Sequence, residues 1–251
     1  MKPKHPNSKG SRGLRAVLPF AAVVTAAVTL AGCSAAGTEP IGRADTAIAG
    51  GTADGTHENV FLLISHQQDR GGLCTATLIA PNLLLTARHC VSPGGGDHVL
   101  CGEAVLGEPY PASAFVATNA AVPTDGSAFF RVTKVQVPVQ GEDTCGYDIA
   151  LIVLAEVVPP HIAEPAIPRI DLEVVPGEAY TAVGYGEDET GASTGSRMRR
   201  EGLSVACEPG SCGSGVESTE FRGEAGICSG DSGGPALDAT GKVVGVVSRG
   251  S

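Results

Sequence analysis

The sequence of 251 residues contains no tryptophan, only 4% aromatic residues and only 18% charged residues. So few charges argue against a coiled coil or a long helical bundle, because both need charged solvent-facing surfaces. An excess of basic residues is lacking too: the net charge of -10 would repel phosphates, which excludes nucleic acid as a partner. Hydrophobic residues make up 42% of the chain, and there are 35 glycines. This composition excludes a disordered chain and favours short strands joined by many turns.

The amino-terminal part has no apolar run long enough to cross a membrane as a helix. The uncharged stretch from Ala16 to Leu30 is shorter than the roughly 20 residues that a membrane helix needs, and Pro19 interrupts it. A basic segment, Lys2 to Arg15, precedes it, and the small residues Ala31 and Gly32 follow. This order predicts a secretory signal rather than a buried core helix.

The end of this segment, Leu30-Ala31-Gly32-Cys33, resembles the lipobox of bacterial lipoprotein signals, in which the cysteine is acylated. The resemblance implies a lipoprotein-type signal peptide over 1–33 and an exported protein that a lipid on Cys33 holds at the membrane surface of the cell envelope. The alternative is an ordinary secreted protein that is cut nearby. Residues 34–47 are small and polar without periodicity, which predicts a tether or pro-segment.

From Ile48 onward, short apolar stretches rich in Val, Ile, Thr and Phe alternate with clusters of Gly, Pro, Asp and Ser. This pattern predicts an all-β fold of antiparallel strands. The expected strands are 60–65, 75–79, 83–87, 129–137, 149–154, 179–183 and 242–248. The segment 157–170 contains four prolines and cannot hold regular structure for long, so we place a boundary near residue 160. The two halves are then 48–160 and 161–251.

Three further motifs carry chemistry. They are LLLTARHC (83–90) with His89, YDIALIVL (147–154) with Asp148, and GICSGDSGGP (226–235) with Ser232. A serine hydroxyl is a poor nucleophile near neutral pH, so it needs a nearby base and a third group that orients the base. The motifs supply these three residue types in the chain order His, Asp, Ser.

Together the motifs resemble the chymotrypsin/trypsin-like serine protease family over Ile48 to Ser251; the family motifs are T-A-A-H-C, D-I-A-L and G-D-S-G-G-P. The resemblance implies two antiparallel β-barrels with the active site between them, and a protein or peptide substrate. It assigns nucleophilic attack to Ser232, proton transfer to His89 and orientation of the imidazole to Asp148. The backbone N–H groups of Gly230 and Ser232 would form the oxyanion hole.

The tetrapeptide Ile48-Ala49-Gly50-Gly51 resembles the mature amino terminus of the family. In the family, cleavage there frees an ammonium group that pairs with the aspartate before the catalytic serine, which is Asp231 here. The residue before Ile48 is Ala47, so we expect an activating protease that cuts after a small residue, or self-cleavage, rather than a trypsin-like activator. The alternative is that Ile48 merely begins the first strand of a chain that is never cut.

In the family, a pocket binds the substrate side chain that precedes the cut bond, and the residues of this pocket set the substrate preference. The position that forms the pocket floor is Gly226, followed by Ile227, so a basic substrate side chain would be buried without a counter-charge. Small or medium apolar side chains are expected instead. Ser248 and Gly250 match the edge that pairs with substrate backbone. Between them, Arg249 either favours acidic substrate groups or faces solvent.

The resemblance also implies a disulfide between Cys74 and Cys90. Proximity in sequence suggests two more pairs, Cys101–Cys145 and Cys207–Cys212, which leaves Cys228 unpaired once Cys33 is set aside for lipid. The family normally continues beyond the stretch that matches SRG, whereas this sequence stops at Ser251. The second barrel is therefore expected to be incomplete, in a fragment or in a naturally shortened protein.

No cofactor or metal is expected from the motifs. Cys207 and Cys212 have no nearby histidine or second cysteine pair, and the acidic residues 187–189 form either a calcium loop or a solvated loop. Two other functions compete with a serine endopeptidase. One is a catalytically impaired protease fold that binds peptides; the other is a carboxylester hydrolase, which the chain order His, Asp, Ser disfavours.

Overall fold

The computed structural model describes residues 48, 50–67, 70–94, 101–187 and 195–249. The expected signal peptide 1–33 with Cys33, the expected tether 34–47, Gly250 and part of the acidic loop lie outside the described residues. The described elements are nearly all strands, as predicted.

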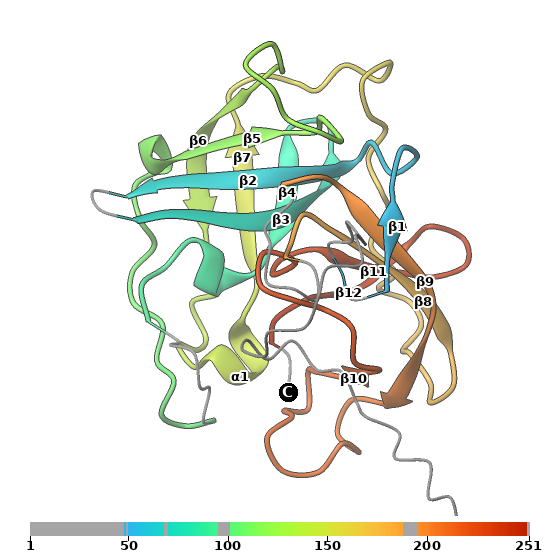
Figure 1. The fold of residues 1–251 in the computed structure, drawn as a ribbon. Coiled ribbons are helices and arrows are strands. Elements are labelled where there is room, and N and C mark those ends of the chain that lie inside the picture. The colour runs from blue at the N-terminus through green and yellow to red at the C-terminus, as the bar shows by residue number, and fades with distance from the viewer. Residues whose placement is uncertain (1–47, 49, 68–69, 95–100, 188–194, 250–251) are drawn as a thin grey trace, which may run out of the picture. The chain divides into compact units, whose positions relative to one another are not determined.

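Six antiparallel strands close into the first barrel, with the order β2-β3-β4-β7-β6-β5 (Figure 1). Their bounds are β2 Val60–Gln67, β3 Arg70–Ala80, β4 Leu83–Thr86, β5 Phe115–Thr118, β6 Phe130–Gln136 and β7 Ala150–Leu154. Alternate residues point inward, and Phe61, Leu78, Leu84 and Ile152 are fully buried in one core. Burying each of these side chains contributes about 1.5 to 3 kcal/mol.

The second sheet runs β1-β9-β8-β11-β12, and β10 pairs with β9. The bounds are β1 Thr52–Ala53, β8 Ala179–Gly184, β9 Met198–Cys207, β10 Arg222–Gly223, β11 Pro235–Leu237 and β12 Val243–Val246. Within the described ranges this sheet is not closed into a barrel. The architecture is therefore that of the expected chymotrypsin-like fold, with one closed barrel and a partial second one.

The first described residues belong to the second sheet rather than to the first half, where the boundary near residue 160 had placed them. Strand β1 lies beside β9 (Figure 1), with Thr52 opposite Arg199. The reason is the side chain of Ile48, which is fully buried in the core formed by Tyr180, Met198 and Leu203. The core in which a short apolar segment is buried decides which sheet the segment joins. The position of the segment in the chain does not show which core this is.

Helical structure is confined to single turns: η1 Arg88–Cys90, η2 Ala112–Ala114 and α1 Thr144–Tyr147. In the part of the chain that the structure describes, no helix has the length and apolarity to span a membrane. The turns η1 and α1 nevertheless matter, because they carry or precede two of the three chemically important residues.

A buried carboxylate, Asp54, joins the second sheet to the first barrel. Its side chain is fully buried and accepts hydrogen bonds from Nε of Arg197 at 2.9 Å and from Nη1 of Arg199 at 3.2 Å. Arg197 in turn donates to the carbonyl oxygens of Asn119 at 2.8 Å and of Val60 at 3.2 Å, which belong to the first half of the chain. This network ties the segment after β1 to both parts of the fold.

The charge of Asp54 is maintained by its partners. Burial raises the pKa of this carboxyl, but hydrogen bonds from His57 and Thr56 outweigh burial and hold it well below its usual range. The carboxylate is therefore ionised throughout the neutral range, and an ionised buried group is costly if its partners are removed.

We predict that Arg197→Ala lowers the free energy of unfolding by about 3 to 5 kcal/mol, because it leaves the buried carboxylate of Asp54 without its closest guanidinium. Urea unfolding measures the change. The control is Glu156→Ala, since Glu156 and Arg131 form an exposed pair at 4.0 Å whose loss should cost less than about 1 kcal/mol. Equal losses in the two variants would contradict the prediction.

Candidate active site

Strand register brings His89 and Asp148 together. Strand β4 pairs with β7, with Thr86 opposite Ala150, so the residues after β4 and before β7 lie at the same end of the barrel. Nδ1 of His89 lies 2.7 Å from Oδ2 of Asp148, and the backbone N–H of His89 donates to Oδ1 at 2.8 Å. The double contact fixes both the position and the orientation of the imidazole.

The carboxylate of Asp148 has a third partner in Ser248, whose hydroxyl donates to Oδ2 at 2.6 Å. The Asp148 side chain is only 2% exposed, whereas His89 is 24% exposed. Burial raises the pKa of Asp148, but the hydrogen bonds from His89 and Ser248 lower it below its usual value. Asp148 is therefore a buried carboxylate at neutral pH, and Nδ1 of His89 is the donor in their hydrogen bond.

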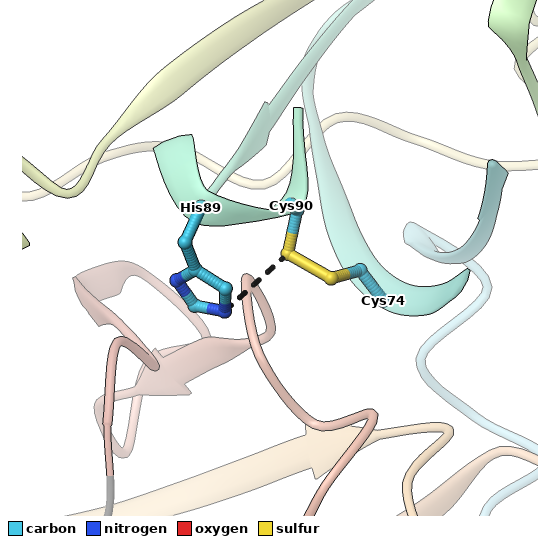
Figure 2. Close-up of side chains that lie close together, drawn as sticks. All are labelled: Cys74, His89 and Cys90. Carbon is cyan, nitrogen blue, oxygen red and sulfur yellow. Dashed lines mark hydrogen bonds between the residues drawn. A yellow bond between two sulfur atoms is a disulfide. The ribbon is translucent and has the colours of Figure 1, made fainter. Parts of the chain in front are cut away.

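The other ring nitrogen of His89 lies beside a disulfide. Nε2 is 3.8 Å from Sγ of Cys90, which is bonded to Cys74 (Figure 2). The spacing of these three side chains would suit a metal ion. Both sulfur atoms are bonded to each other, however, so neither is available as a thiolate ligand. The group therefore does not fit a metal centre.

A cleft of about 290 Å³ opens beside this ring. Its lining includes His89, the Cys74–Cys90 disulfide, Ser65, Ser92 and Tyr110. Because the ring is the partly exposed member of the His89–Asp148 pair, a molecule in this cleft would meet the imidazole and not the carboxylate.

The backbone of Ser232 is held close to His89 by contacts across the two sheets. Thr75 on β3 donates its backbone N–H to the carbonyl of Ser232 at 2.8 Å, and its hydroxyl donates to the carbonyl of Gly230 at 2.9 Å. Sγ of Cys90 lies 3.6 Å from the same Ser232 carbonyl. Among the contacts between described residues, however, no hydrogen bond joins the Ser232 hydroxyl to His89. The three groups are neighbours without forming one hydrogen-bonded line.

The glycine-rich turn around Ser232 is shaped by close packing. A Cβ on Gly233, whose φ is +83°, would lie 2.1 Å from Oγ1 of Thr86 and 2.2 Å from the carbonyl of Thr75, so only glycine fits. None of the hydrogen bonds between described residues uses the backbone N–H of Gly230 or of Ser232. Neither N–H group is therefore occupied by a partner among the described residues.

Asp231 is buried in a space that two glycines provide. Cβ atoms on Gly184 and Gly186 would lie 2.3 Å and 2.6 Å from its Oδ1. The carboxyl accepts the backbone N–H groups of Gly186 and Cys228, each at 2.9 Å. Burial raises the pKa of Asp231 to about 7, because these two hydrogen bonds offset it only in part. No cation from the described residues bonds to this carboxyl.

The expected pocket floor has a cation close by. Gly226 has a φ of +136°, and a Cβ there would lie 2.0 Å from Nη1 of Arg200, which also donates to the carbonyl of Ala225 at 3.2 Å. Ile227 packs against the core of the second sheet, which contains Tyr180 and Met198. Residue 226 therefore offers no carboxylate, and the guanidinium of Arg200 lies beside it.

Arg249 differs from both alternatives that the sequence left open. It neither faces solvent nor stands ready for an acidic substrate, because Nη1 and Nη2 donate to the two carboxylate oxygens of Glu220 at 2.7 and 2.6 Å. The sequence analysis missed Glu220, since nothing in its local sequence marks it as a partner of a residue 29 positions away.

Arg88, next to His89, is a second residue whose role the sequence hides. Its side chain is buried, and Nη1 donates to the carbonyl of Gly141 at 2.5 Å while Nη2 donates to that of Leu106 at 3.3 Å. These bonds attach η1 to the loops that surround the His89–Asp148 pair.

The three expected disulfides are present: Cys74–Cys90, Cys101–Cys145 and Cys207–Cys212. The expectation that Cys228 is unpaired is wrong, because this cysteine is also disulfide-bonded. The odd count behind that expectation came from setting Cys33 aside for a lipid.

Comparisons with known proteins give one family. The family model described as Trypsin matches residues 48–251. Scolexin B of Heliothis virescens is 26% identical over 190 residues, which cover 71% of this chain and 65% of that protein. Trypsin of Simulium vittatum is 27% identical over 190 residues, which cover 70% of each chain. The chain thus spans about two thirds of the length of these curated relatives.

Because the carboxyl of Asp231 is buried, we predict that the free energy of unfolding depends on pH. Its folded-state pKa of about 7 exceeds the ordinary value of 3.8, so the unfolded chain binds fewer protons than the folded chain between these values. The free energy of unfolding should therefore fall by a few kcal/mol as pH rises from about 4 to 7. Urea unfolding of the uncut chain at pH 5 and 7 measures this fall, and Asp231→Asn should remove most of it. Asp171→Asn, at an exposed carboxyl, is the control; equal slopes in both variants would contradict the assignment.

Proposed function

Because the chain belongs to the trypsin family of serine proteases, we propose that it is a serine endopeptidase that cleaves peptide bonds through an acyl-enzyme on Ser232. The observation that carries the proposal is the hydrogen-bonded pair of His89 and Asp148 beside the backbone of Ser232. An imidazole oriented by a buried carboxylate next to a serine is the arrangement that nucleophilic acyl transfer requires.

The roles follow from the hydrogen bonds. Because Nδ1 of His89 is used by Asp148, Nε2 is the nitrogen left to accept the proton of the Ser232 hydroxyl. The hydroxyl oxygen attacks the substrate carbonyl, and the imidazolium then gives the proton to the leaving amine. The N–H groups of Gly230 and Ser232 donate hydrogen bonds to the carbonyl oxygen and stabilise the negative charge that develops on it. The hydroxyl must first approach Nε2, which is a contact that often tightens only when substrate is bound.

Activation is proposed to act through Asp231. Cleavage before Ile48 would create an ammonium group, and pairing with it would compensate a carboxyl that two backbone N–H groups satisfy only in part. Since Asp231 lies between Gly230 and Ser232, its ionisation and pairing would rearrange both N–H groups of the oxyanion site. The cut follows Ala47, which fits an activating protease that accepts small residues, or the protein itself.

The substrate residue before the cut bond is proposed to be apolar and small or medium in size. A Lys or Arg side chain reaching Gly226 would find no carboxylate there and would meet the guanidinium that lies beside this glycine. Burying a cation without a counter-charge is strongly disfavoured.

The proposed location is outside the cytoplasm, since the three described disulfides need an oxidising compartment.

A second candidate is a protease fold that binds peptides without cleaving them. The missing hydrogen bond between the Ser232 hydroxyl and His89, in the contacts that the structure describes, favours it. The following experiment separates the two candidates.

We predict that a fluorophosphonate probe labels Ser232 once the chain is cut before Ile48. In an Ala47→Arg variant, added trypsin can make this cut at a chosen time, and terminal sequencing verifies the new end. Labelling should accelerate by at least about 100-fold after the cut, because the oxyanion site forms only then. Adding His89→Ala should slow labelling by about 1,000-fold or more.

The control for activation is the same chain carrying Asp231→Asn, which can be cut but lacks the carboxylate that would bind the ammonium group. It should remain at the labelling rate of the uncut protein. A correctly cut wild-type site that does not react with the probe would instead establish the peptide-binding candidate.

A peptide library tests the proposed specificity. We expect kcat/KM for peptides with Lys or Arg before the cut bond to be at least about 100-fold lower than for Ala, Val or Leu, since the cation would be buried unpaired. Mass spectrometry of the cleaved library identifies the preferred residues. A preference for basic residues would refute the assignment of Gly226.

A further inference from the structure

We propose that Glu220 and Arg249 are positioning residues: their ion pair holds Ser248 against Asp148 and balances the charge around the His89–Asp148 pair. The inference rests on the proposed function for its link to catalysis, although the interaction itself can be measured without activity. The side chains of the pair reach the imidazole only indirectly in the described contacts, through Ser248 and Asp148.

The ion pair is well defined. The guanidinium of Arg249 meets the carboxylate of Glu220 through two hydrogen bonds, of 2.7 and 2.6 Å. The side chains are only 21% and 16% exposed, so solvent screens the pair less than an ordinary surface pair. A further hydrogen bond runs from Nη2 of Arg249 to the carbonyl of Gly215 at 3.0 Å. Together these contacts fix the direction of the Arg249 side chain.

The Arg249 end of the ion pair is linked to Asp148 through the hydroxyl of Ser248. Nη1 of Arg249 donates to Oγ of Ser248 at 3.3 Å, and the same Oγ donates to Oδ2 of Asp148 at 2.6 Å. A hydroxyl that accepts from a cation and donates to an anion is polarised in one direction, which strengthens both bonds. The side chain of Ser248 is thereby held in the rotamer that contacts Asp148.

On the other side, the pair reaches the backbone just before the acid. Oε1 of Glu220 accepts the N–H of Gly146 at 2.8 Å, and the hydroxyl of Thr219 donates to the carbonyl of Gly146 at 3.0 Å. Gly146 has a φ of +85°, and a Cβ there would lie 3.2 Å from both Glu217 and Thr219. The ring of contacts is then closed, because Gly146 precedes Asp148 by two residues.

Charge balance gives the ion pair a second effect on the site. The hydrogen bonds that Arg249 donates to Glu220 raise the pKa of Arg249 although burial lowers it, and the charges of Asp148 and Asp143 raise it further. Burial raises the pKa of Glu220, but hydrogen bonds from Arg249 bring it below its usual value. Both groups are thus charged at neutral pH and cancel each other. Removing one leaves the other's charge next to the Ser248–Asp148 contact.

Few charged or titratable groups among the described contacts lie near the His89 ring. Asp148 contacts the ring directly, and the Glu220–Arg249 pair lies behind Asp148 and Ser248. Tyr110 lines the cleft on the ring's open side, and the adjoining cysteines are joined in a disulfide that does not titrate. The charges behind the acid in these contacts are those of the proposed pair and of Asp143, which also acts on Arg249.

The test compares Glu220→Gln, Arg249→Gln and the double variant in the full chain. Histidine NMR follows the pH midpoint of the His89 ring, which is identified by the signal lost in His89→Ala. Glu220→Gln leaves an unpaired cation and should lower the midpoint by about half a pH unit; Arg249→Gln leaves an unpaired anion and should raise it by a similar amount. The double variant should return to within about 0.2 of the wild type.

Kinetics of the cut enzyme give the second readout. Each single variant should lower kcat by about 10-fold with KM changed less than about 3-fold, because orientation of the imidazole is lost while substrate contacts remain. Glu220→Asp, which keeps the charge, should restore the wild-type midpoint, and it serves if Glu220→Gln fails to fold. The matched control is Glu217→Gln, at an exposed acid on the same segment.

Opposite midpoint shifts in the two single variants support the inference, since a general loss of structure would move both in the same direction. Midpoints that do not move, or that move together, overturn it even if Ser232 still reacts with the fluorophosphonate probe. Opposite shifts in a protein that does not label would support the positioning network and refute the proposed protease activity. The two proposals therefore fail separately.

Discussion

One buried threonine connects the two halves of the site. Thr75 donates its backbone N–H to Ser232 and its hydroxyl to Gly230, accepts the N–H of Tyr185 on that hydroxyl at 3.0 Å, and is fully buried. Its neighbour in the chain, Cys74, is bonded to Cys90, which follows His89. A continuous series of covalent and hydrogen bonds thus leads from the serine turn to the imidazole. Leaving any buried member of this series without its partner would cost the full desolvation of that group.

The buried acids show how environment decides the state of a carboxyl. Asp54 and Asp148 are held ionised by hydrogen bonds from side chains, whereas burial raises the pKa of Asp231, which meets only two backbone N–H groups in the described contacts. The first two stabilise the fold and orient the imidazole. The third is a buried carboxyl with a raised pKa next to Ser232, and its proposed partner is an ammonium group that arrives only after cleavage. Glu220 adds a fourth acid, which offsets the charge of Arg249 behind Asp148.

Much of the fold follows from the sequence, because barrel strands alternate apolar and polar residues between clear turn signals. All seven expected stretches contain a strand, from β2 to β12. The strands that were missed have reasons. β9 begins with Met198, Arg199 and Arg200, and the two charged residues mask the alternation, while β5 is only four residues long. Ile48 was assigned to the wrong half because apolarity predicts burial but does not identify the core.

For the candidate site, the sequence alone determined which residue types stand in which motif and their order along the chain, because these follow from local pattern. The resemblance to the family implied the disulfide Cys74–Cys90, and proximity in sequence suggested Cys101–Cys145 and Cys207–Cys212. Only the tertiary structure decided that Arg249 meets Glu220, that Asp54 meets Arg197, and that Ser232 lies beside His89 without a hydrogen bond between their side chains in the described contacts. Such pairings join segments far apart in the chain. They depend on strand register and on glycine-lined space, neither of which has a local signature.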